Sequence, residues 1–313
     1  MQTTSMIEKQ MPDVIRGSVE SRFKRWIGLM LISPWLIGLL LFSLIPILAS
    51  FVLSFTDFHL LTPEQVQFIG IENYVGVVKD KEAWRVLWLT IRLALIVIPL
   101  QTLASIFIAA LLSSQRLWKR DFLRTLFFLP SIIPAFSAAL MWRGYVNPDT
   151  GWLNRLILGP IGLSALDQFF LGGVSQPLFI LSSLWTIGPG ILIMMGAMQG
   201  IPNEVYEAAI MDGANRLTRF FRITIPMITP AIFFSLVLNI TAVFGGAMLL
   251  DHGDSFRAEY SSYDGYVRSI IFDIYHLGYA ASLAWVFFVI VMILVLILFR
   301  TSKNWVYFPD QDK

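Results

Sequence analysis

The stretch EAAIMDGANRLTRFFRITIPMITP, residues 207–230, is polar where much of the chain is apolar. It carries two carboxylates, three arginines spaced by three residues, one glycine and two prolines, and apolar runs long enough to cross a bilayer flank it on both sides. Gly213 follows Asp212 and can adopt the positive φ that ends a helix and turns the chain. The stretch therefore predicts two short helices, joined at Gly213, between two membrane spans.

The first short helix is expected to run from about Glu204 to Met211, after Pro202 ends the preceding span. Asn203 is the expected N-cap, because its side chain can accept a hydrogen bond from a free amide of the first turn. The second helix runs through ANRLTRFFR, residues 214–222, and separates apolar from basic side chains, namely Leu217, Phe220 and Phe221 from Arg216, Arg219 and Arg222. Such a helix suits the headgroup boundary of a membrane. For the arginines alone, an ordinary connecting loop that enforces topology is the favoured explanation.

The composition extends the membrane interpretation to the whole chain. Of its 313 residues, 56% are hydrophobic and 14% charged, whereas a soluble domain carries about 25% charged residues. A span needs about 20 apolar residues, and the segments that qualify are 26–55, 86–112, 122–146, 176–200, 224–250 and 278–300. Prolines interrupt several of them, which favours a packed bundle in which neighbouring helices satisfy the freed carbonyl groups.

Lysines and arginines set the predicted orientation, because they accumulate on the cytoplasmic side. Most of the 23 lie in the segment before the first span, in the second-to-third and fourth-to-fifth loops, and after the last span. Residues 1–25 and 301–313 are therefore expected to be cytoplasmic tails of a protein of the cell (inner) membrane. The polar lead followed by a long apolar run is interpreted as a retained tail and a true span, not as a cleaved signal peptide.

Several function classes are disfavoured by what the sequence lacks. The six predicted spans contain no Asp or Glu, which weakens the hypothesis of a proton- or cation-coupled carrier. There is no Gly-Lys pair, so a phosphate-binding loop of the GxxxxGK[ST] type is absent. No cysteine is present, and His59, His252 and His276 match no metal-ligand spacing. An embedded enzyme would need a nucleophile, a metal cluster or an acid–base pair, and none is found.

Glu207-Ala208-Ala209, Gly213 and Ile223-Thr224-Ile225-Pro226 together resemble the cytoplasmic signature of permease subunits in binding-protein-dependent ABC importers. The form EAAIMDGA…FF.ITIP…P is most similar to the carbohydrate importers of the maltose and glycerol-phosphate type. Further segments resemble the same family, namely FIGIENYVGVV (68–78), RTLFFLPSIIPAFSAALMW (124–142), GWLNRLIL (151–158), LWTIGPGILIMMGAMQGIPNEVYEAA (184–209) and YHLGYAASLAW (275–285).

The resemblance implies an all-α bundle of six transmembrane helices, spanning 26–300, with a cytoplasmic coupling loop at 201–223. It also implies a non-catalytic, pathway-forming subunit, one of two permeases, the second of which is expected to be a distinct homologue. Two ATPase subunits would bind ATP and Mg²⁺, an extracytoplasmic binding protein would deliver a carbohydrate, and membrane lipid would surround the spans. No cofactor, metal or nucleic acid is expected on this chain. The alternative is a stand-alone channel or secondary carrier for a small polar solute.

Residue roles follow from the same resemblance. Glu207 would face a basic residue of the ATPase, Ala208 and Ala209 would permit close packing, and Gly213 would form the turn. The remaining coupling candidates are Asp212, Ala214, Phe220 and Pro226. The resemblance also assigns Asn239, thirteen residues beyond Pro226, to the substrate pathway.

Polar residues of the fourth span supply the other pathway candidates, Ser182, Trp185 and Thr186. Sugars are held by hydrogen bonds and by aromatic faces, but Ser, Thr and Asn also join membrane helices to one another, and both interpretations stay open. One segment departs from the family pattern: LLDHGDSFRAEYSSYDGYV (249–267) stands where a T-G-G-G-P segment is common. A solvated outer loop is the expected structure there.

Overall fold

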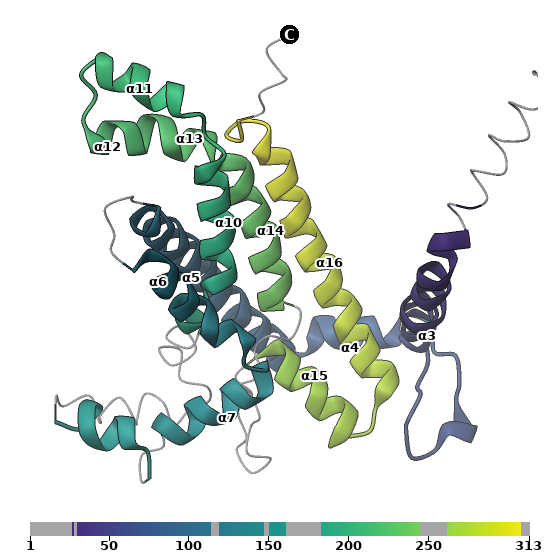
Figure 1. The fold of residues 1–313 in the computed structure, drawn as a ribbon. Coiled ribbons are helices and arrows are strands. Elements are labelled where there is room, and N and C mark those ends of the chain that lie inside the picture. Colours follow the sequence, from purple (N-terminus) through teal and green to yellow (C-terminus); the bar gives the residue numbers. More distant parts are fainter. Residues whose placement is uncertain are drawn as a thin grey trace, which may run out of the picture.

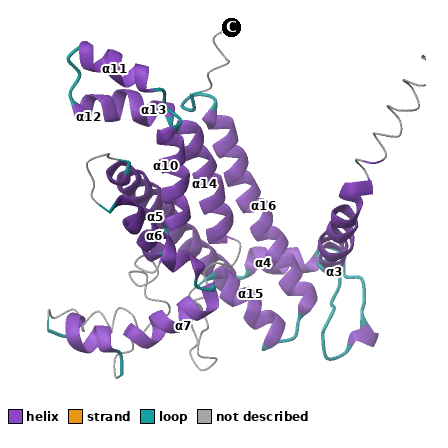
Figure 2. Ribbon diagram, viewed as in Figure 1, coloured by secondary structure: helices purple, strands orange, loops and turns teal. Residues whose placement is uncertain are grey.

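The computed structural model describes residues 27, 30–113, 119–146, 150–160, 183–244 and 262–307. These residues are mostly helical and contain no β-strand, only two isolated bridges, Thr56 to Phe68 and His59 to His276 (Figures 1 and 2). The all-α prediction is confirmed for this part of the chain. The predicted N-terminal tail, 1–25, lies outside the described residues.

Three helices in the described ranges are long and apolar enough to cross a membrane. They are the segment Met30–Leu53, which includes η1 (Leu40–Leu44) and α3 (Ile45–Leu53), then α5 (Lys81–Leu112) and α16 (Leu277–Ser302). A fourth candidate is a bent pair, Arg216–Met227 and Thr229–Ala242, whose two parts meet at 63°. The second part belongs to α14 (Thr229–Phe244), and this pair covers much of the predicted fifth span.

The segments predicted as third and fourth spans contain shorter helices. Residues 122–146 hold most of α6 (Arg120–Phe128), the 3₁₀ turn η3 (Leu129–Ile132) and α7 (Ala135–Val146). Pro130 lies in η3 and Pro134 directly precedes α7, so the breaks fall where a proline removes a backbone donor. In the fourth segment, α10 (Gly188–Gln199) begins with Pro189 in its first turn. Residues 161–182 lie outside the described part.

The core of the bundle is formed where α10 packs along α5. Met194 and Ala109 are fully buried there, and Ile191 is almost so. In Figure 1, α10, α14 and α16 run side by side, with α11 (Asn203–Met211) and α12 (Arg216–Arg219) at one end of the bundle. At the opposite end lie α4 (Glu72–Lys79) and α15 (Tyr263–Phe272), which close a second cluster against α5 and α16.

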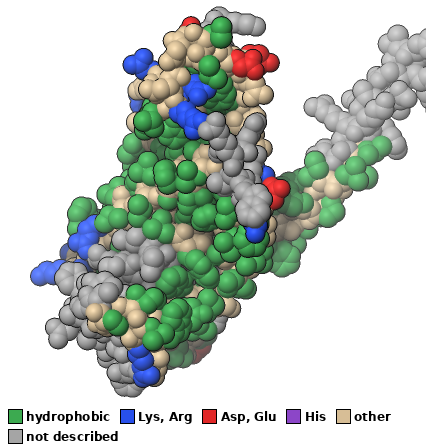
Figure 3. Space-filling model, turned by 60° about the vertical axis from the view of Figure 1, so that its left-hand side comes forward, with side chains coloured by type: hydrophobic (Ala, Val, Ile, Leu, Met, Phe, Trp, Pro, Cys, Tyr) green, Lys and Arg blue, Asp and Glu red, His purple; other side chains and the backbone are tan. Residues whose placement is uncertain are grey.

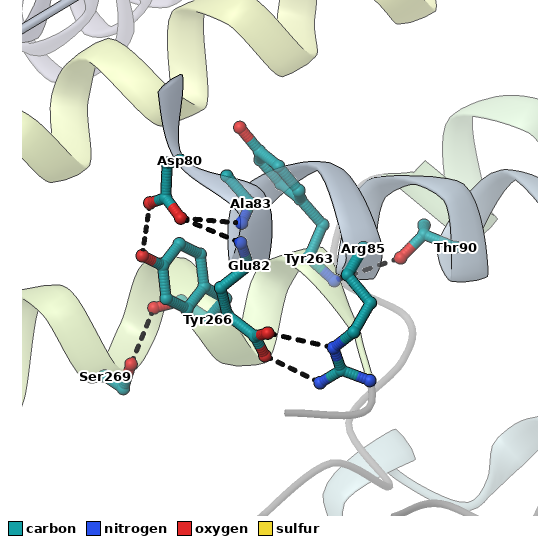
Figure 4. Close-up of polar contacts among 8 residues, drawn as sticks. All are labelled: Asp80, Glu82, Ala83, Arg85, Thr90, Tyr263, Tyr266 and Ser269. Carbon is teal, nitrogen blue, oxygen red and sulfur yellow. Dashed lines mark hydrogen bonds and ion pairs between the residues drawn. The ribbon is translucent and has the colours of Figure 1, made fainter. Parts of the chain in front are cut away.

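Asp80 joins three helices at this second end of the bundle. We call Asp80, Tyr266 and Tyr279 together the Asp80 clasp. Its Oδ1 accepts hydrogen bonds from the amides of Glu82 (2.9 Å) and Ala83 (3.1 Å), and so caps the N-terminus of α5 (Figure 4). Its Oδ2 accepts from the hydroxyl groups of Tyr266 on α15 (2.5 Å) and Tyr279 on α16 (2.7 Å). One carboxylate therefore fixes α5, α15 and α16 to one another.

The expectation of a solvated outer loop for 249–267 is wrong for residues 262–267, which cap and begin α15. Ser262 caps α15 by accepting from the amide of Gly265 (3.1 Å), and Tyr263 is 2% exposed. The Tyr263 amide donates to Thr90 Oγ1 on α5 (3.0 Å), its hydroxyl donates to the Leu283 carbonyl on α16 (2.9 Å), and its ring stacks on Phe287 at 4.7 Å. The acidic character of the segment hid an amphipathic helix whose tyrosines face inward. The rest of that segment, 249–261, lies outside the described residues.

The FIGIENYVGVV segment packs beside the clasp. The Asn73 amide donates to the carbonyl oxygens of Ser54 (2.9 Å) and Thr56 (2.8 Å), and Ser54 shares a hydrogen bond with Tyr74 (2.7 Å). Gly278, at the start of α16, lies very close to the segment that contains Thr56. A Cβ at Gly278 would overlap the Thr56 carbonyl oxygen. The turn that follows the Met30–Leu53 helix therefore packs tightly against the start of α16.

Candidate functional site

The elbow, which we define as residues 201–227, is a helical hairpin with its turn at Gly213. Its first arm is α11, and its second arm is α12 continued by the π-helical η6 (Phe220–Thr224) and α13 (Ile225–Met227). Gly213 has a φ of +78°, as predicted from its position after Asp212. The prediction of Asn203 as N-cap is wrong by one residue, because Pro202 holds that position and Asn203 is already helical.

The turn of the elbow is closed by its own backbone. The amide of Gly213 donates to the carbonyl of Ile210 (2.9 Å), and the amide of Ala214 donates to that of Ala209 (2.9 Å). The second arm begins with an N-cap, since Asn215 Oδ1 accepts from the amide of Thr218 (2.8 Å). These bonds fix the angle between the arms without a partner protein, so the elbow is a defined hairpin.

The base of the elbow is fastened to the core. The Tyr206 hydroxyl and Thr224 Oγ1 share a hydrogen bond (2.9 Å), which ties the first arm to the second. Ile201 is buried, and Phe220 and Ile225 pack against the α5–α10 core. At the bend into α14, Thr229 Oγ1 donates to the Pro226 carbonyl (2.7 Å) and accepts from the amide of Tyr307 (2.8 Å). The elbow and the helices of the bundle are therefore mechanically joined.

The tip of the elbow is exposed. Glu207, Ala208, Asp212 and Gly213 are all exposed, and Ala209 and Ala214 are half-buried. Large apolar side chains are also exposed there, namely Ile210 (53%), Met211 (88%), Leu217 (70%) and Phe221 (64%). At the top of Figure 3, acidic and basic side chains gather over this hairpin, above a face that is mainly apolar. A surface with this mixture of apolar and charged groups is typical of a protein–protein contact.

The predicted division of the second arm into an apolar and a basic side holds only in part. Leu217 and Phe221 are exposed, whereas Phe220 is half-buried against the core. Arg219 is half-buried, and its Nε is buried without a hydrogen-bond partner among the described residues. From Phe220 to Thr224 the second arm is π-helical, so the side chains after Arg219 change register relative to an ideal helix.

One candidate pathway residue, Asn239, and the backbone beside a second, Trp185, bond to one turn of α5. Asn239, on α14, donates from Nδ2 to Thr102 Oγ1 (3.4 Å). Gln101, the residue before Thr102, donates from Nε2 to the carbonyl of Ser183 (3.0 Å). Ser183 lies two residues before Trp185. Thr186 is exposed and donates to the same carbonyl (3.3 Å), and Ser182 lies outside the described residues. The structure brings Asn239 and the Trp185 segment to adjacent positions of one helix.

Sequence reasoning missed Gln101 and Thr102, because the search for polar groups at membrane depth was confined to the fourth and fifth spans. The signal was present: two adjacent polar residues interrupt an otherwise apolar run in the middle of α5. The bond from Asn239 to Thr102 is a contact between helices, as the helix-joining interpretation requires. This hydrogen bond uses only the Nδ2 donor of Asn239, and the Asn239 side chain is half-buried.

The histidines of the described chain sit at the opposite end of the bundle. The rings of His59 and His276 lie 6.0 Å apart, where the two segments pair as an antiparallel bridge. The described ranges contain no group of three or more His, Asp or Glu side chains placed to hold a metal ion. His252 lies outside those ranges.

Comparisons with known proteins agree with this geometry. The family described as "Binding-protein-dependent transport system inner membrane component" matches residues 101–307. YesP of Bacillus subtilis, a probable ABC transporter permease protein, is 35% identical over 96% of this chain and 98% of its own length. MalF of Thermococcus litoralis, a trehalose/maltose transport system permease protein, is 29% identical over 68% of this chain and 72% of its own.

A solved bacterial ABC transporter involved in the import of the acidic polysaccharide alginate has the same fold. One of its chains superposes with a TM-score of 0.74 at 22% identity, covering 92% of this chain and 99% of that one. The chain described here belongs to the family of inner membrane components of binding-protein-dependent transport systems.

Proposed function

We propose that this chain is the non-catalytic, pathway-forming subunit of an ATP-driven importer for a carbohydrate. The observation that carries the proposal is the elbow, whose base is fastened to the helix core while its tip exposes Glu207, Ala208 and large apolar side chains. A hairpin held in this way acts as a lever, because a force applied at the tip is transmitted into α14 and α10. A channel or carrier working alone has no use for such a lever.

The partner at the tip is proposed to be an ATPase subunit. Glu207 would pair with a basic residue of the ATPase, Ala208 and Ala209 would let the two backbones approach, and Gly213 would keep the turn. Asp212, Ala214, Phe220 and Pro226 would shape and support this contact. ATP and Mg²⁺ would be bound by the ATPase pair, and this chain would bind neither.

The remaining assembly follows from the exposed apolar surface. In the most apolar 18-residue stretch of Met30–Leu53, 0% of the residues are buried, and in that of Leu277–Ser302 11% are buried. Both helices therefore need lipid or a second permease around them. The proposed arrangement has six spans in the cell membrane, with both termini cytoplasmic, and a distinct sister permease. An extracytoplasmic binding protein would deliver the substrate to the end of the bundle that carries the Asp80 clasp.

A carbohydrate is the proposed substrate because the named substrates of the relative and of the structural neighbour are of that class: trehalose and maltose for one, alginate for the other. Asn239, Trp185, Thr186 and Ser182 are the proposed pathway residues. Hydroxyl-rich solutes suit such amide and hydroxyl groups, and an indole face suits the C–H surface of a sugar ring.

Co-purification and ATP hydrolysis test this function together. Chain isolated from its native membrane is expected to bring down an ATPase and a second permease, and its ATPase activity is expected to rise when a sugar-loaded binding protein is added. Recovery of the chain alone, with solute flux in liposomes that needs no ATP, would instead establish the stand-alone channel or carrier.

A further inference from the structure

Four aromatic rings form a continuous row beside the candidate pathway. Trp185 lies 5.7 Å from Trp142 between ring centroids, Trp142 lies 6.5 Å from Tyr145, and Tyr145 lies 5.3 Å from Trp152. Trp142 and Tyr145 belong to α7, and Trp152 belongs to the segment that follows it. Each pair is arranged edge to face, so successive rings turn different surfaces outward.

The row connects the pathway candidates with an exposed ring. At one end, Trp185 follows Ser183, whose carbonyl is held by Gln101 next to the Thr102–Asn239 pair. At the other end, Trp152 is 50% exposed. Rings that only filled a core would be enclosed at both ends, whereas this row begins beside half-buried polar groups and ends at an accessible indole.

One hydrogen-bond donor within the row lacks an acceptor. The Nε1 of Trp142 is buried and has no hydrogen-bond partner among the described residues. Buried indole N–H groups usually find a partner, because an unpaired one carries a desolvation cost. Because Nε1 is closed off from the surface, the Trp142 ring must turn before a ligand hydroxyl can supply the missing acceptor.

We propose that Trp142, Tyr145 and Trp152 extend the Trp185 site into an aromatic platform for a sugar ring. The proposal rests on the carbohydrate function proposed above and specifies the class further: the substrate carries a pyranose or furanose ring. The C–H face of such a ring packs on the aromatic surfaces, and one of its hydroxyl groups accepts from Trp142 Nε1 once the Trp142 ring has turned toward it. An acyclic polyol phosphate such as glycerol 3-phosphate has no ring face to offer.

Direct binding of sugar to the purified complex, without its binding protein, tests the platform. Trehalose, maltose, an alginate oligosaccharide and glycerol 3-phosphate are each added at millimolar concentration. Saturation of the aromatic protons of the protein is then followed by NMR for its transfer to the C–H protons of the solute. We expect transfer to at least one ring sugar and none to glycerol 3-phosphate.

Three variants separate the contributions. Trp152→Leu removes an exposed ring and is expected to raise the Kd about tenfold, whereas Trp152→Phe, which restores a ring, recovers most of the affinity. Trp142→Phe keeps a ring but removes the donor, and is expected to raise the Kd about fivefold. Trp88→Leu is the matched control, since Trp88 is a 64% exposed tryptophan on α5 outside the row, and it should leave binding unchanged.

The two proposals fail in different ways. If a sugar-loaded binding protein stimulates ATP hydrolysis but no sugar binds the complex directly, or if Trp152→Leu binds as tightly as wild type, the platform is overturned and the importer function stands. If none of the sugars stimulates hydrolysis or binds, the carbohydrate function fails and the platform fails with it.

Discussion

The two ends of the bundle satisfy their polar groups in opposite ways. At the Asp80 clasp, one carboxylate accepts four hydrogen bonds, and all four donors belong to this chain. At the elbow, the internal bonds stop at the base and the turn, while Met211 and Leu217 stand 88% and 70% exposed. A cluster whose polar groups hydrogen-bond to one another stabilises the fold. An ordered hairpin that exposes apolar side chains at its tip is suited to contact with a partner. The comparison predicts loss of stability at one end and loss of coupling at the other.

Substitution of the elbow tip is expected to have the largest effect. Glu207→Ala and Gly213→Trp should both insert and fold, because Glu207 is exposed and a Cβ at Gly213 would meet no atom within 4 Å. Uptake should nevertheless be abolished, since breaking a desolvated charge pair at an interface costs about 2–5 kcal/mol. Transport by complexes reconstituted in liposomes is the measurement.

Glu72→Ala, at an exposed glutamate in the first turn of α4, is the matched control for loss of a carboxylate. Because it lies at the end proposed to receive the binding protein, its readout is co-purification of the ATPase, which it should leave unchanged and which Glu207→Ala should weaken. Wild-type uptake by a reconstituted Gly213→Trp complex would contradict the lever.

A pair of alanine substitutions at glycines sharpens the comparison next. A Cβ at Gly278 would overlap the backbone oxygen of Thr56, which cannot move aside as a flexible side chain could, so Gly278→Ala should cost at least about 1–3 kcal/mol of stability. Gly213→Ala has no such overlap, and only its φ of +78° opposes it, by about 1–2 kcal/mol confined to the turn.

Thermal unfolding of the purified chain measures the difference between the two. An equal loss of melting temperature in both variants would mean that the turn of the elbow is as tightly integrated as the contact between α16 and the Thr56 segment.

The same contrast explains which parts of the structure could be predicted from sequence. The turn at Gly213 and the short helix up to Met211 follow from local signals, since glycine after a polar residue and proline before a helix act within a few residues. The Asp80 clasp does not, because Tyr266 and Tyr279 lie about two hundred residues along the chain from Asp80 and only tertiary packing brings them together. No local pattern marks that pairing.

The candidate pathway falls between these cases. Asn239 and Trp185 could be proposed from sequence, but their common support on Gln101 and Thr102 depends on how α10 and α14 pack on α5. The helix α15 was missed for another reason. Its acidic and tyrosine-rich sequence resembles a loop until Tyr263 and Tyr266 are seen to share the buried side.

Removal of the clasp carboxylate should have an intermediate effect. Asp80→Ala deletes the N-cap of α5, worth about 1 kcal/mol, and the bonds from two tyrosine hydroxyl groups to a charged acceptor. We expect a loss of roughly 4–7 kcal/mol in all, because each hydrogen bond to a charged group contributes about 1.5–3 kcal/mol. Tyr266→Phe, which removes one hydroxyl, should cost less.

The melting temperatures of both clasp variants should fall, and hydrogen exchange should increase first in α15. Unchanged exchange in α15 would show that the apolar cluster alone holds that helix.

Acid should produce the smallest effect, and only at the clasp. Burial raises the pKa of Asp80, but the hydrogen bonds from Tyr266, Tyr279 and the two amides outweigh it, so the pKa lies below the ordinary value. A carboxyl group with a lowered pKa in the folded state stabilises the fold above its unfolded pKa of about 3.9, and this contribution is lost as the pH falls through the folded value. Stability at the clasp should therefore be constant between about pH 7 and pH 5 and decline only below about pH 4.

Hydrogen exchange at matched pH values should show α15 opening in acid before α11 does, and Asp80→Asn, which cannot ionise, should remove that acid step in α15. Opening of α11 and α15 together would place the acid sensitivity outside the clasp, in the bundle that the two ends share.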